Sequence, residues 1–387
     1  MLTVAATIVE RLAQLFAVLL MLLAGFAAVA RRVRQGRERR RLDAEKRVRP
    51  MLLDLIDSHA EGSPDAVPDL PPELGRYVDV LALNLAGKLR GSDRSVLVEL
   101  LRRRGVVDRA RHDLAAGSAV KRLRAVELLG SLALPETLDE LTARLYDRNL
   151  DVRRAAVRAV GRIPTSGGAR ALLDLLDAPD RQVPEHCVTL ALLRSGQPAV
   201  APLVAALAPE LSAQRSRAQL AAAHVLGWMG ELAAVDPLLH LLDLLDQADP
   251  AGTTSLAATT SPAASTSPAG TSGSRDASEA KVRLDRRLAV IEALGRIGSP
   301  AAAGPLQNCL DPAQPALIRG AAAAALGRLG DPRSADILTG LLATEHPLAL
   351  RAATALNQLG PAGRTRLTDH ADDSPEARDV LRLAVAR

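Results

Sequence analysis

The chain has 387 residues, of which 48% are hydrophobic but only 1% aromatic, and its net charge is +5. So few aromatic side chains exclude the stacking platforms of single-stranded nucleic-acid binding, and two cysteines exclude a disulfide framework. Residues 31–49 hold ten basic and three acidic side chains, a local charge of +7, so the rest of the chain carries −2 and no nucleic-acid partner is expected.

The first predicted element is a membrane-spanning helix at the amino terminus. Residues 12–30 are an apolar run with Gln14 as its one strongly polar member, and at ~1.5 Å per residue they extend about 28 Å. We therefore expect residues 1–30 to be a transmembrane anchor. A cleaved signal peptide is the alternative, because residues 28–30 have the small-residue pattern of a cleavage site, although the basic cluster follows the apolar run instead of preceding it.

The basic segment 31–49 predicts the orientation of this anchor. Positive charge stays on the cytoplasmic side, so a single-pass protein of the inner membrane with its amino terminus outside is expected. Arginines beside a membrane attract anionic lipid headgroups, each contributing about 1 kcal/mol. The predicted membrane-surface residues are Arg31, Arg32, Arg34, Arg37, Arg39, Arg40 and Arg41.

Residues 50–117 contain segments with helical apolar spacing, separated by a proline-rich stretch. We interpret them as a helical capping region that closes the stack of units that follows, since the end units of such stacks must be atypical to stay soluble. Pro50 is expected to interrupt any helix that continues from the membrane.

From residue 118 a short apolar phrase returns seven times, and one position near its end marks each unit. The seven marker positions are Gly130, Gly161, Leu193, Gly227, Gly295, Gly327 and Asn357. The intervals between successive markers are 31, 32, 34, 68, 32 and 30. Periods of this size are typical of solenoids, in which each unit buries its apolar face only by stacking on its neighbours.

The register holds around each marker. A leucine or valine always precedes it, and in five units a glycine stands three positions after it, where a left-handed helix cap is expected. Each phrase is therefore interpreted as the first helix of a pair, followed by a second amphipathic helix such as residues 171–177. The predicted fold is an all-α solenoid of about seven helix pairs, whose second helices would line a partner-binding wall.

The one double interval, from Gly227 to Gly295, has a compositional cause. Residues 247–279 consist almost entirely of alanine, serine, threonine, proline and glycine, so we expect a disordered inserted loop. Without that segment the interval shortens from 68 to 35, an ordinary spacing. The repeats are thus predicted over 118–246 and 280–387, the latter ending in a capping helix.

These units resemble HEAT-like repeats, specifically the short repeats first noted in phycobilisome lyases. The resemblance rests on phrases such as LDVRRAAVRAVGRIP followed by ALLDLLD. It includes an arginine eight positions before the marker in four units, which implies a structural ladder paired with acids. The excess of arginine over lysine and the many alanines and leucines are expected of a bacterial protein.

The resemblance implies a fold and leaves the activity open. The family includes bilin lyases and di-iron deoxyhypusine hydroxylases, so an enzyme or enzyme-maturation factor is the alternative function. The hydroxylases carry His-Glu pairs, whereas this chain has only the reversed pairs at 185–186 and 345–346. Reversal moves each ligand about 100° around a helix. No catalytic residue, metal ligand or cofactor is therefore predicted.

The remaining hypothesis is non-covalent binding of another protein, such as a membrane-associated enzyme. The residue directly after the marker is an arginine in four units and a tryptophan in the central one, and exposed tryptophans often anchor partners. The candidate partner-binding residues are Arg162, Arg194, Trp228, Arg296 and Arg328.

Overall fold

The computed structural model describes residues 21, 31–32, 46–57, 74–178, 183–208, 216–247 and 272–385. The predicted anchor at 12–30 therefore lies outside the described residues, except for Met21. Among the described helices, none is by itself both long and apolar enough to cross a bilayer. Two helices joined by a 115° bend, Glu185–Ser195 and Gln197–Ala206, pass that test of length and composition only as a pair.

The chain divides into two compact units, residues 1–112 and 113–387. In the first unit, residues 46–57 are helical, followed by α2 (Gly75–Ala86), α3 (Gly91–Arg103) and α4 (Val106–Leu114), which runs into the second unit. Helices α2 and α3 pack together. The described helix at 46–57 continues through Pro50, so the predicted interruption there is wrong.

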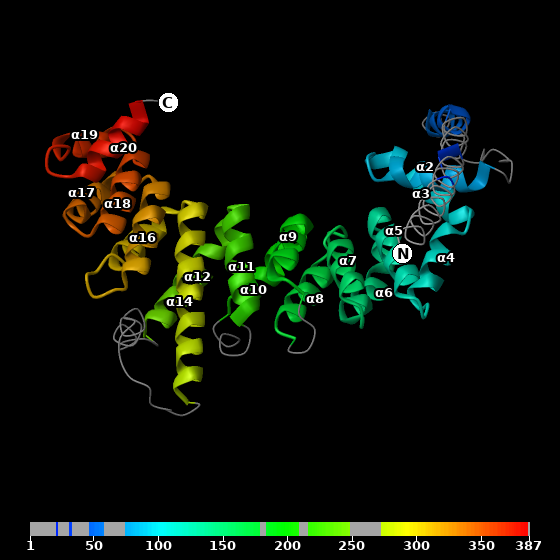
Figure 1. Cartoon of the computed structure of the whole chain (residues 1–387), viewed down its shortest axis with the longest axis horizontal. Coiled ribbons are helices and arrows are strands. Elements are labelled where there is room, and N and C mark those ends of the chain that lie inside the picture. The colour runs from blue at the N-terminus through cyan, green and yellow to red at the C-terminus, as the bar shows by residue number, and fades with distance from the viewer. Residues whose placement is uncertain are drawn as a thin grey trace, which may run out of the picture. The chain divides into compact units, whose positions relative to one another are not determined.

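The second unit is a succession of paired helices (Figure 1). Its first helices are α5 (Ala119–Leu132), α7 (Leu150–Val160), α9 (Glu185–Ser195), α11 (Ser216–Met229), α14 (Ser272–Ile297), α16 (Ala316–Leu329) and α18 (His346–Gln358). Its second helices are α6 (Leu138–Ala143), α8 (Ser166–Leu176), α10 (Val200–Ala206), α12 (Val235–Gln247), α15 (Ala303–Asn308), α17 (Ala335–Gly340) and α19 (Pro361–Asp369). The closing helix is α20 (Pro375–Val385). The prediction of about seven pairs is thus confirmed within the described residues.

The first helices form one layer, because each packs against the first helix of the next pair, from α5 to α18. The second helices pack against the following first helix, as α8 does against α9 and α12 against α14. Short 3-10 turns such as η6 (Leu232–Ala234), η7 (Pro300–Ala302) and η8 (Pro332–Ser334) lead into several second helices. Two layers of helices therefore share one continuous apolar interior.

The interior is built from the repeated positions that the sequence predicts. The residue before each marker has no exposed surface in any of the seven units; these residues are Leu129, Val160, Leu192, Leu226, Leu294, Leu326 and Leu356. The glycine three positions after the marker has a positive φ in all five units that contain one. Gly330 is left-handed helical, whereas Gly196 and Gly360 have ψ near −145°, a region that glycine alone reaches easily.

The marker glycines let adjacent first helices touch through their backbones. A β-carbon on five of them would lie under 3 Å from an alanine of the next first helix, which is too close for any side chain. The pairs are Gly130 with Ala159, Gly161 with Ala191, Gly227 with Ala293, Gly295 with Ala325 and Gly327 with Ala355. Because the Gly227 pair joins α11 to α14, the stack continues across the inserted segment.

Of the predicted loop at 247–279, residues 248–271 lie outside the described residues. Gln247 ends α12, and α14 begins at Ser272, so residues 272–279 are helical although the prediction placed them in the loop. Their sequence, SGSRDASE, contains no large apolar residue, and the helix gains such residues only further along. Extending an existing helix by a few residues costs far less than nucleating one, which explains this difference.

Candidate protein-binding surface

The five predicted partner-binding residues all stand at the carboxyl ends of first helices. We call them the arginine–tryptophan row: Arg162 after α7, Arg194 on α9, Trp228 on α11, Arg296 on α14 and Arg328 on α16. Arg162, Arg194, Trp228 and Arg328 are exposed, and Arg296 is half-buried. An arginine in the last turn of a helix also interacts favourably with the partial negative charge of the carbonyl end.

Trp228 and Arg296 are in direct contact although they belong to repeats on either side of the inserted segment. The guanidinium carbon of Arg296 lies 4.1 Å from the centroid of the Trp228 ring, a cation–π geometry. Arg296 also donates from Nη2 to Oε1 of Glu292 at 2.5 Å. Trp228 nevertheless keeps 64% of its surface exposed, so most of this large apolar side chain faces solvent.

The arginines of the row influence one another electrostatically. Burial lowers the pKa of Arg162, and the positive charges of Arg194 and Arg158 lower it further, against a smaller opposing effect of Glu127. Burial likewise lowers the pKa of Arg328; there the attraction of Glu292 opposes the shift, while the charge of Arg296 adds to it. Neighbouring guanidinium groups of the row therefore repel each other, although burial is the larger cause of both shifts.

The series of glycine–alanine contacts between first helices is interrupted where α9 meets α11. At this junction the marker is Leu193, and Val225 of α11 occupies the position that holds the contacting alanine in other units. Leu193 remains 37% exposed, and Leu190, one turn earlier on α9, is 63% exposed. Val225 is fully buried, so of the two residues that replace glycine and alanine at this junction only Leu193 places an apolar side chain at the surface.

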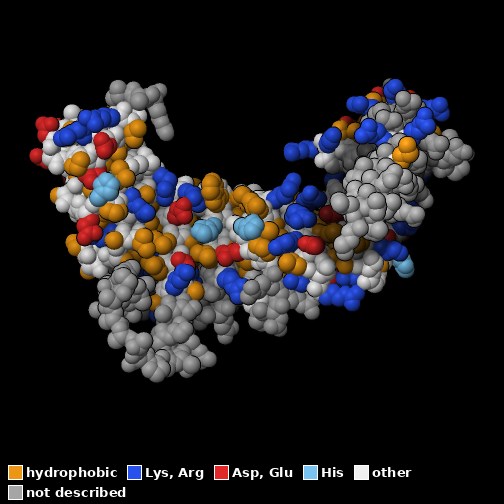
Figure 2. Space-filling model, in the orientation of Figure 1, with side chains coloured by type: hydrophobic (Ala, Val, Ile, Leu, Met, Phe, Trp, Pro, Cys, Tyr) orange, Lys and Arg blue, Asp and Glu red, His pale blue; other side chains and the backbone are white. Residues whose placement is uncertain are grey.

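These leucines extend the apolar surface offered by the tryptophan. We define the central apolar patch as Leu190, Leu193, Trp228 and Leu232, the last being 67% exposed in η6. Figure 2 shows apolar side chains exposed among basic, acidic and histidine side chains on one face of the second unit. The sequence prediction missed the three leucines, and the one available signal was the leucine at a marker position that glycine occupies in five units.

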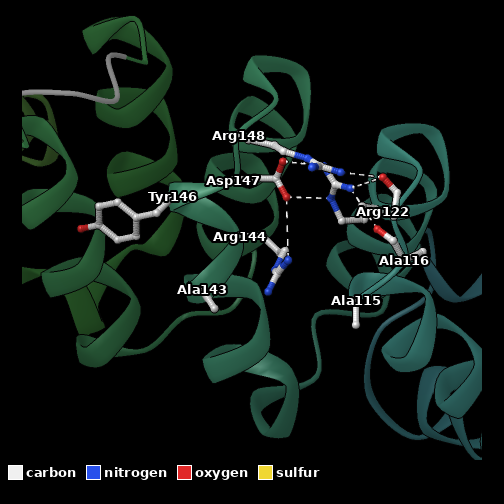
Figure 3. Close-up of a pocket in the computed structure, with 9 residues that line it drawn as sticks. Ala115, Ala116, Arg122, Ala143, Arg144, Tyr146, Asp147 and Arg148 are labelled. Atoms are coloured by element: carbon white, nitrogen blue, oxygen red, sulfur yellow. Dashed lines mark hydrogen bonds and ion pairs between the residues drawn. The ribbon is translucent and has the colours of Figure 1, made fainter.

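A second candidate site is a polar pocket of about 370 Å³ beside the first repeat (Figure 3). It is lined by Ala115, Ala116, Gly117, Arg122, Ala143, Arg144, Tyr146, Asp147 and Arg148. Arg122 donates from Nε and Nη2 to the two carboxylate oxygens of Asp147, both at 2.8 Å, and each side chain is 4% exposed. Its Nη1 donates to the carbonyls of Ala116 and Gly117.

The arginines that line this pocket connect the segment around residues 144–148 to the loop at 114–117. Arg148 donates to the carbonyl of Gly117 at 2.8 Å, and Arg144 donates to the carbonyl of Leu114 at 3.3 Å. Because the guanidinium groups satisfy backbone carbonyls of a loop, this arrangement is structural. Arg122 and Asp147 form the first arginine–acid pair of the ladder that the resemblance implies. Arg287 and Asp246 form another, with Nη2 of the arginine 2.5 Å from Oδ1 of the aspartate.

A larger hollow of about 880 Å³ lies between the turns η7 and η8. It is lined by Pro300, Ala303, Gly304, Gln307, Leu329, Gly330, Asp331, Pro332 and Arg333. Asp331 and Arg333 are the ionisable members of this lining, and Asp331 accepts a hydrogen bond from the amide of Arg333 at the start of η8. The carboxylate therefore caps a turn, and the hollow is a surface groove between two repeats.

Other predicted residues are only partly described. Arg31 and Arg32 are exposed, whereas the predicted membrane-surface residues Arg34, Arg37, Arg39, Arg40 and Arg41 lie outside the described residues. In the part of the chain that the structure describes, no three His, Cys, Asp or Glu side chains are grouped to hold a metal ion. In the reversed pair at 345–346, Nδ1 of His346 lies 2.6 Å from Oε1 of Glu376 in a hydrogen bond. In the pair at 185–186, burial raises the pKa of Glu185, and the positive charges of His224 and Arg217 oppose that shift.

Stacked helix pairs with a repeated buried register define this chain as a helical repeat protein. The model of the HEAT-repeat family matches residues 109–192 and 283–360, so these two segments, less than half of the chain, are similar to HEAT repeats, as the resemblance implies. No protein of curated function matches the sequence significantly.

Several solved structures are similar to this chain at low sequence identity. Importin beta, crystallised in an ammonium sulfate condition, is 14% identical over 88% of this chain and 43% of its own, with a TM-score of 0.48. The CpcE–CpcF complex of phycocyanin lyase from a Nostoc species is 20% identical over 72% of this chain and 94% of its own, with a TM-score of 0.27. Human deoxyhypusine hydroxylase in complex with glycerol is 23% identical over 72% of this chain and 94% of its own, with a TM-score of 0.24. This chain spans less than half of the importin chain.

Proposed function

We propose that this chain is a membrane-tethered scaffold that binds another protein through the arginine–tryptophan row and the central apolar patch. The observation that carries the proposal is Trp228, a 64% exposed tryptophan in contact with Arg296 on a molecule whose repeated apolar positions before the markers are fully buried. Exposed tryptophan and arginine side chains are among the residue types most enriched in binding hot spots. The surface lies at the ends of first helices, and not on the second helices that the sequence prediction favoured.

The tether in this proposal is the apolar run at residues 12–30 of a bacterial inner-membrane protein, with the repeats in the cytoplasm. The basic segment 31–49 would hold the repeats near anionic lipid. Confinement to one membrane surface raises the effective concentration of the scaffold around a membrane-associated partner such as an enzyme. The activity proposed is binding without catalysis, and stoichiometric iron in purified protein would contradict that part.

The test is site-specific photo-cross-linking of the full-length protein in its own membrane. A photo-reactive amino acid at Trp228 should give a discrete adduct with another protein, whereas the same group at Asp336, an exposed position on α17, should not. Deletion of residues 1–30 should release the protein from the membrane and weaken the Trp228 adduct. Identical adducts at both positions, or unchanged location after the deletion, would show the proposal to be wrong.

A further inference from the structure

We propose that the segment bound at this surface is an extended acidic stretch of the partner with one large apolar residue at its centre. This inference rests on the proposed function and adds the chemistry of the partner. It follows from the order of side chains along the layer of first helices, from the charges that lack partners, and from the apolar patch between them.

The order of side chains is basic, apolar, basic. Arg162 on the α7 side and Arg194 on α9 come first, the central apolar patch on α9, α11 and η6 follows, and Arg296 and Arg328 on α14 and α16 come last. Consecutive first helices pack against each other, so this sequence of helices is also the spatial order. A ligand lying across the layer therefore meets positive charge at both ends.

Most arginines at the basic ends form no ion pair in the part of the chain that the structure describes. Among the described residues, Arg162, Arg194 and Arg328 form no ion pair within 4 Å, and only Arg296 contacts a carboxylate, that of Glu292. Burial is the main cause of the lowered pKa values of Arg162 and Arg328, and repulsion from neighbouring guanidinium groups lowers them further. Glu127 opposes the shift at Arg162, and Glu292 opposes it at Arg328 more strongly than Arg296 adds to it. A partner with carboxylates at both ends relieves this repulsion, whereas a basic partner increases it.

The centre of the surface selects an apolar residue. The ring of Trp228 and the side chains of Leu190, Leu193 and Leu232 are exposed, with no charged residue among the four. Covering them removes apolar surface from water, and a side chain such as leucine or isoleucine can lie against the ring. A purely acidic ligand would leave this patch uncovered.

The spacing of the helices sets the length of the segment. Packed helices are about 8–10 Å apart, so Arg194 and Arg296, two helix positions apart, are separated by roughly 20 Å. An extended chain advances about 3.3 Å per residue, so acidic residues are expected about three positions on either side of the apolar residue. Arg162 and Arg328 are four helix positions apart, roughly 40 Å, so a segment of about twelve residues then also reaches both.

The experiment uses the intrinsic fluorescence of Trp228, because it is the single tryptophan of the chain. Full-length protein in detergent is titrated with tryptophan-free peptides of about twelve residues that carry aspartates at both ends and a central leucine. We expect a saturable change in the emission of Trp228 and an affinity that falls with added salt. A peptide with lysine in place of aspartate, and one with serine in place of leucine, should each bind at least tenfold more weakly.

Charge reversal supplies the matched variants. The pair Arg162→Glu and Arg328→Glu should weaken binding of the acidic peptide at least tenfold and allow the lysine peptide to bind. The control pair Arg170→Glu and Arg333→Glu, at exposed positions on α8 and η8, should leave the affinity within twofold. An equal circular dichroism spectrum shows that each variant folds.

Several results would overturn the proposal: equal affinity for acidic and basic peptides, an unchanged affinity after reversal at the row, or preference for an oligonucleotide of equal charge over the peptide. These results are separable from failure of the proposed function. If the peptides do not bind but the cross-linker at Trp228 still captures a protein that the control position does not, the surface docks a protein of different chemistry. If neither occurs, both proposals are wrong.

Discussion

The Cα atom of Ala293 on α14 lies 2.7 Å from the position that a β-carbon on Gly227 of α11 would occupy. The two residues belong to first helices that the inserted segment separates in sequence. Their contact leaves no room for a side chain on Gly227, so the backbone packing that joins four other pairs of neighbouring repeats also joins the repeats on either side of the insertion.

Gly227→Ala is expected to destabilise the protein by about 1–3 kcal/mol, because the new methyl group meets backbone atoms that cannot move without separating α11 from α14. Gly304→Ala is the matched control, since a β-carbon there meets nothing within 4 Å. It should be neutral or stabilise α15 by about 0.5–1 kcal/mol. Urea denaturation of both variants, followed by circular dichroism, measures the difference; equal midpoints would refute the backbone contact.

The Arg122–Asp147 pair is expected to contribute stability that depends on pH. Burial alone would raise the pKa of Asp147, but hydrogen bonds from Arg122 and from the amide of Asn149, with the charges of Arg122 and Arg144, outweigh it and lower the pKa below the usual 3.8. The contribution is therefore complete above about pH 4 and is lost as the pH falls through the lowered value.

Asp147→Asn tests this dependence. The variant should be less stable than the wild type at pH 7, and the difference should shrink as the pH falls below 4, because the wild-type carboxylate is then protonated too. Thermal denaturation across this range is the measurement. A stability difference that stays constant down to pH 2 would contradict the role of the carboxylate charge.

The two cysteines should differ in reactivity. Burial, together with the nearby Asp246, raises the pKa of the Cys309 thiol to about 12 against the opposing effect of Arg287, whereas Cys187 is partly exposed. At pH 8 only about one Cys309 in 10⁴ would be a thiolate, the reactive form. A thiol reagent should label Cys187 alone in native protein and both cysteines in denaturant. Rapid native labelling of Cys309 would show that the repeat around it opens readily.

The closing helix α20 is expected to depend on the hydrogen bond between His346 and Glu376. That bond lowers the pKa of Glu376 below its usual 4.5; hydrogen bonds from the amide of Glu376 and the hydroxyl of Ser374 also lower it, whereas burial raises it. The contribution of this carboxylate to stability is therefore present above pH 4.5 and is lost as the pH falls through the lowered value. His346→Ala should speed amide hydrogen exchange in α20 at neutral pH. His240→Ala, an exposed histidine on α12, serves as the control and should leave that exchange unchanged.

The periodicity of the sequence predicts the paired helices well, because each repeated residue type has one physical task. The residue before the marker is always buried, and the glycine after it always has a positive φ. The predicted arginine–tryptophan row also proves to be contiguous at Trp228 and Arg296. A strict repeat places equivalent residues of neighbouring units side by side, which is why spacing alone could indicate this contact.

Deviations from the repeat could not be read in the same way. Gln219 stands where four other units have an arginine, and the buried Arg286 of α14 donates to it at 2.6 Å, a contact that depends on packing across the insertion. The exposure of Leu190 and Leu193 depends on how closely α9 approaches α11, which the sequence of neither helix determines. The helix through Pro50 shows that a proline does not always end a helix.

The missing glycine–alanine pair between α9 and α11 has a mechanical consequence. Backbones in contact resist sliding and tilting, whereas this joint holds the side chains of Leu193 and Val225 in place of glycine and alanine. We expect elastic bending of the second unit to concentrate there, within the surface assigned to the partner. Paired spin labels on α7 and α11 should therefore report a broader distance distribution than pairs on α14 and α18, and a rigid partner seated across the joint would narrow it.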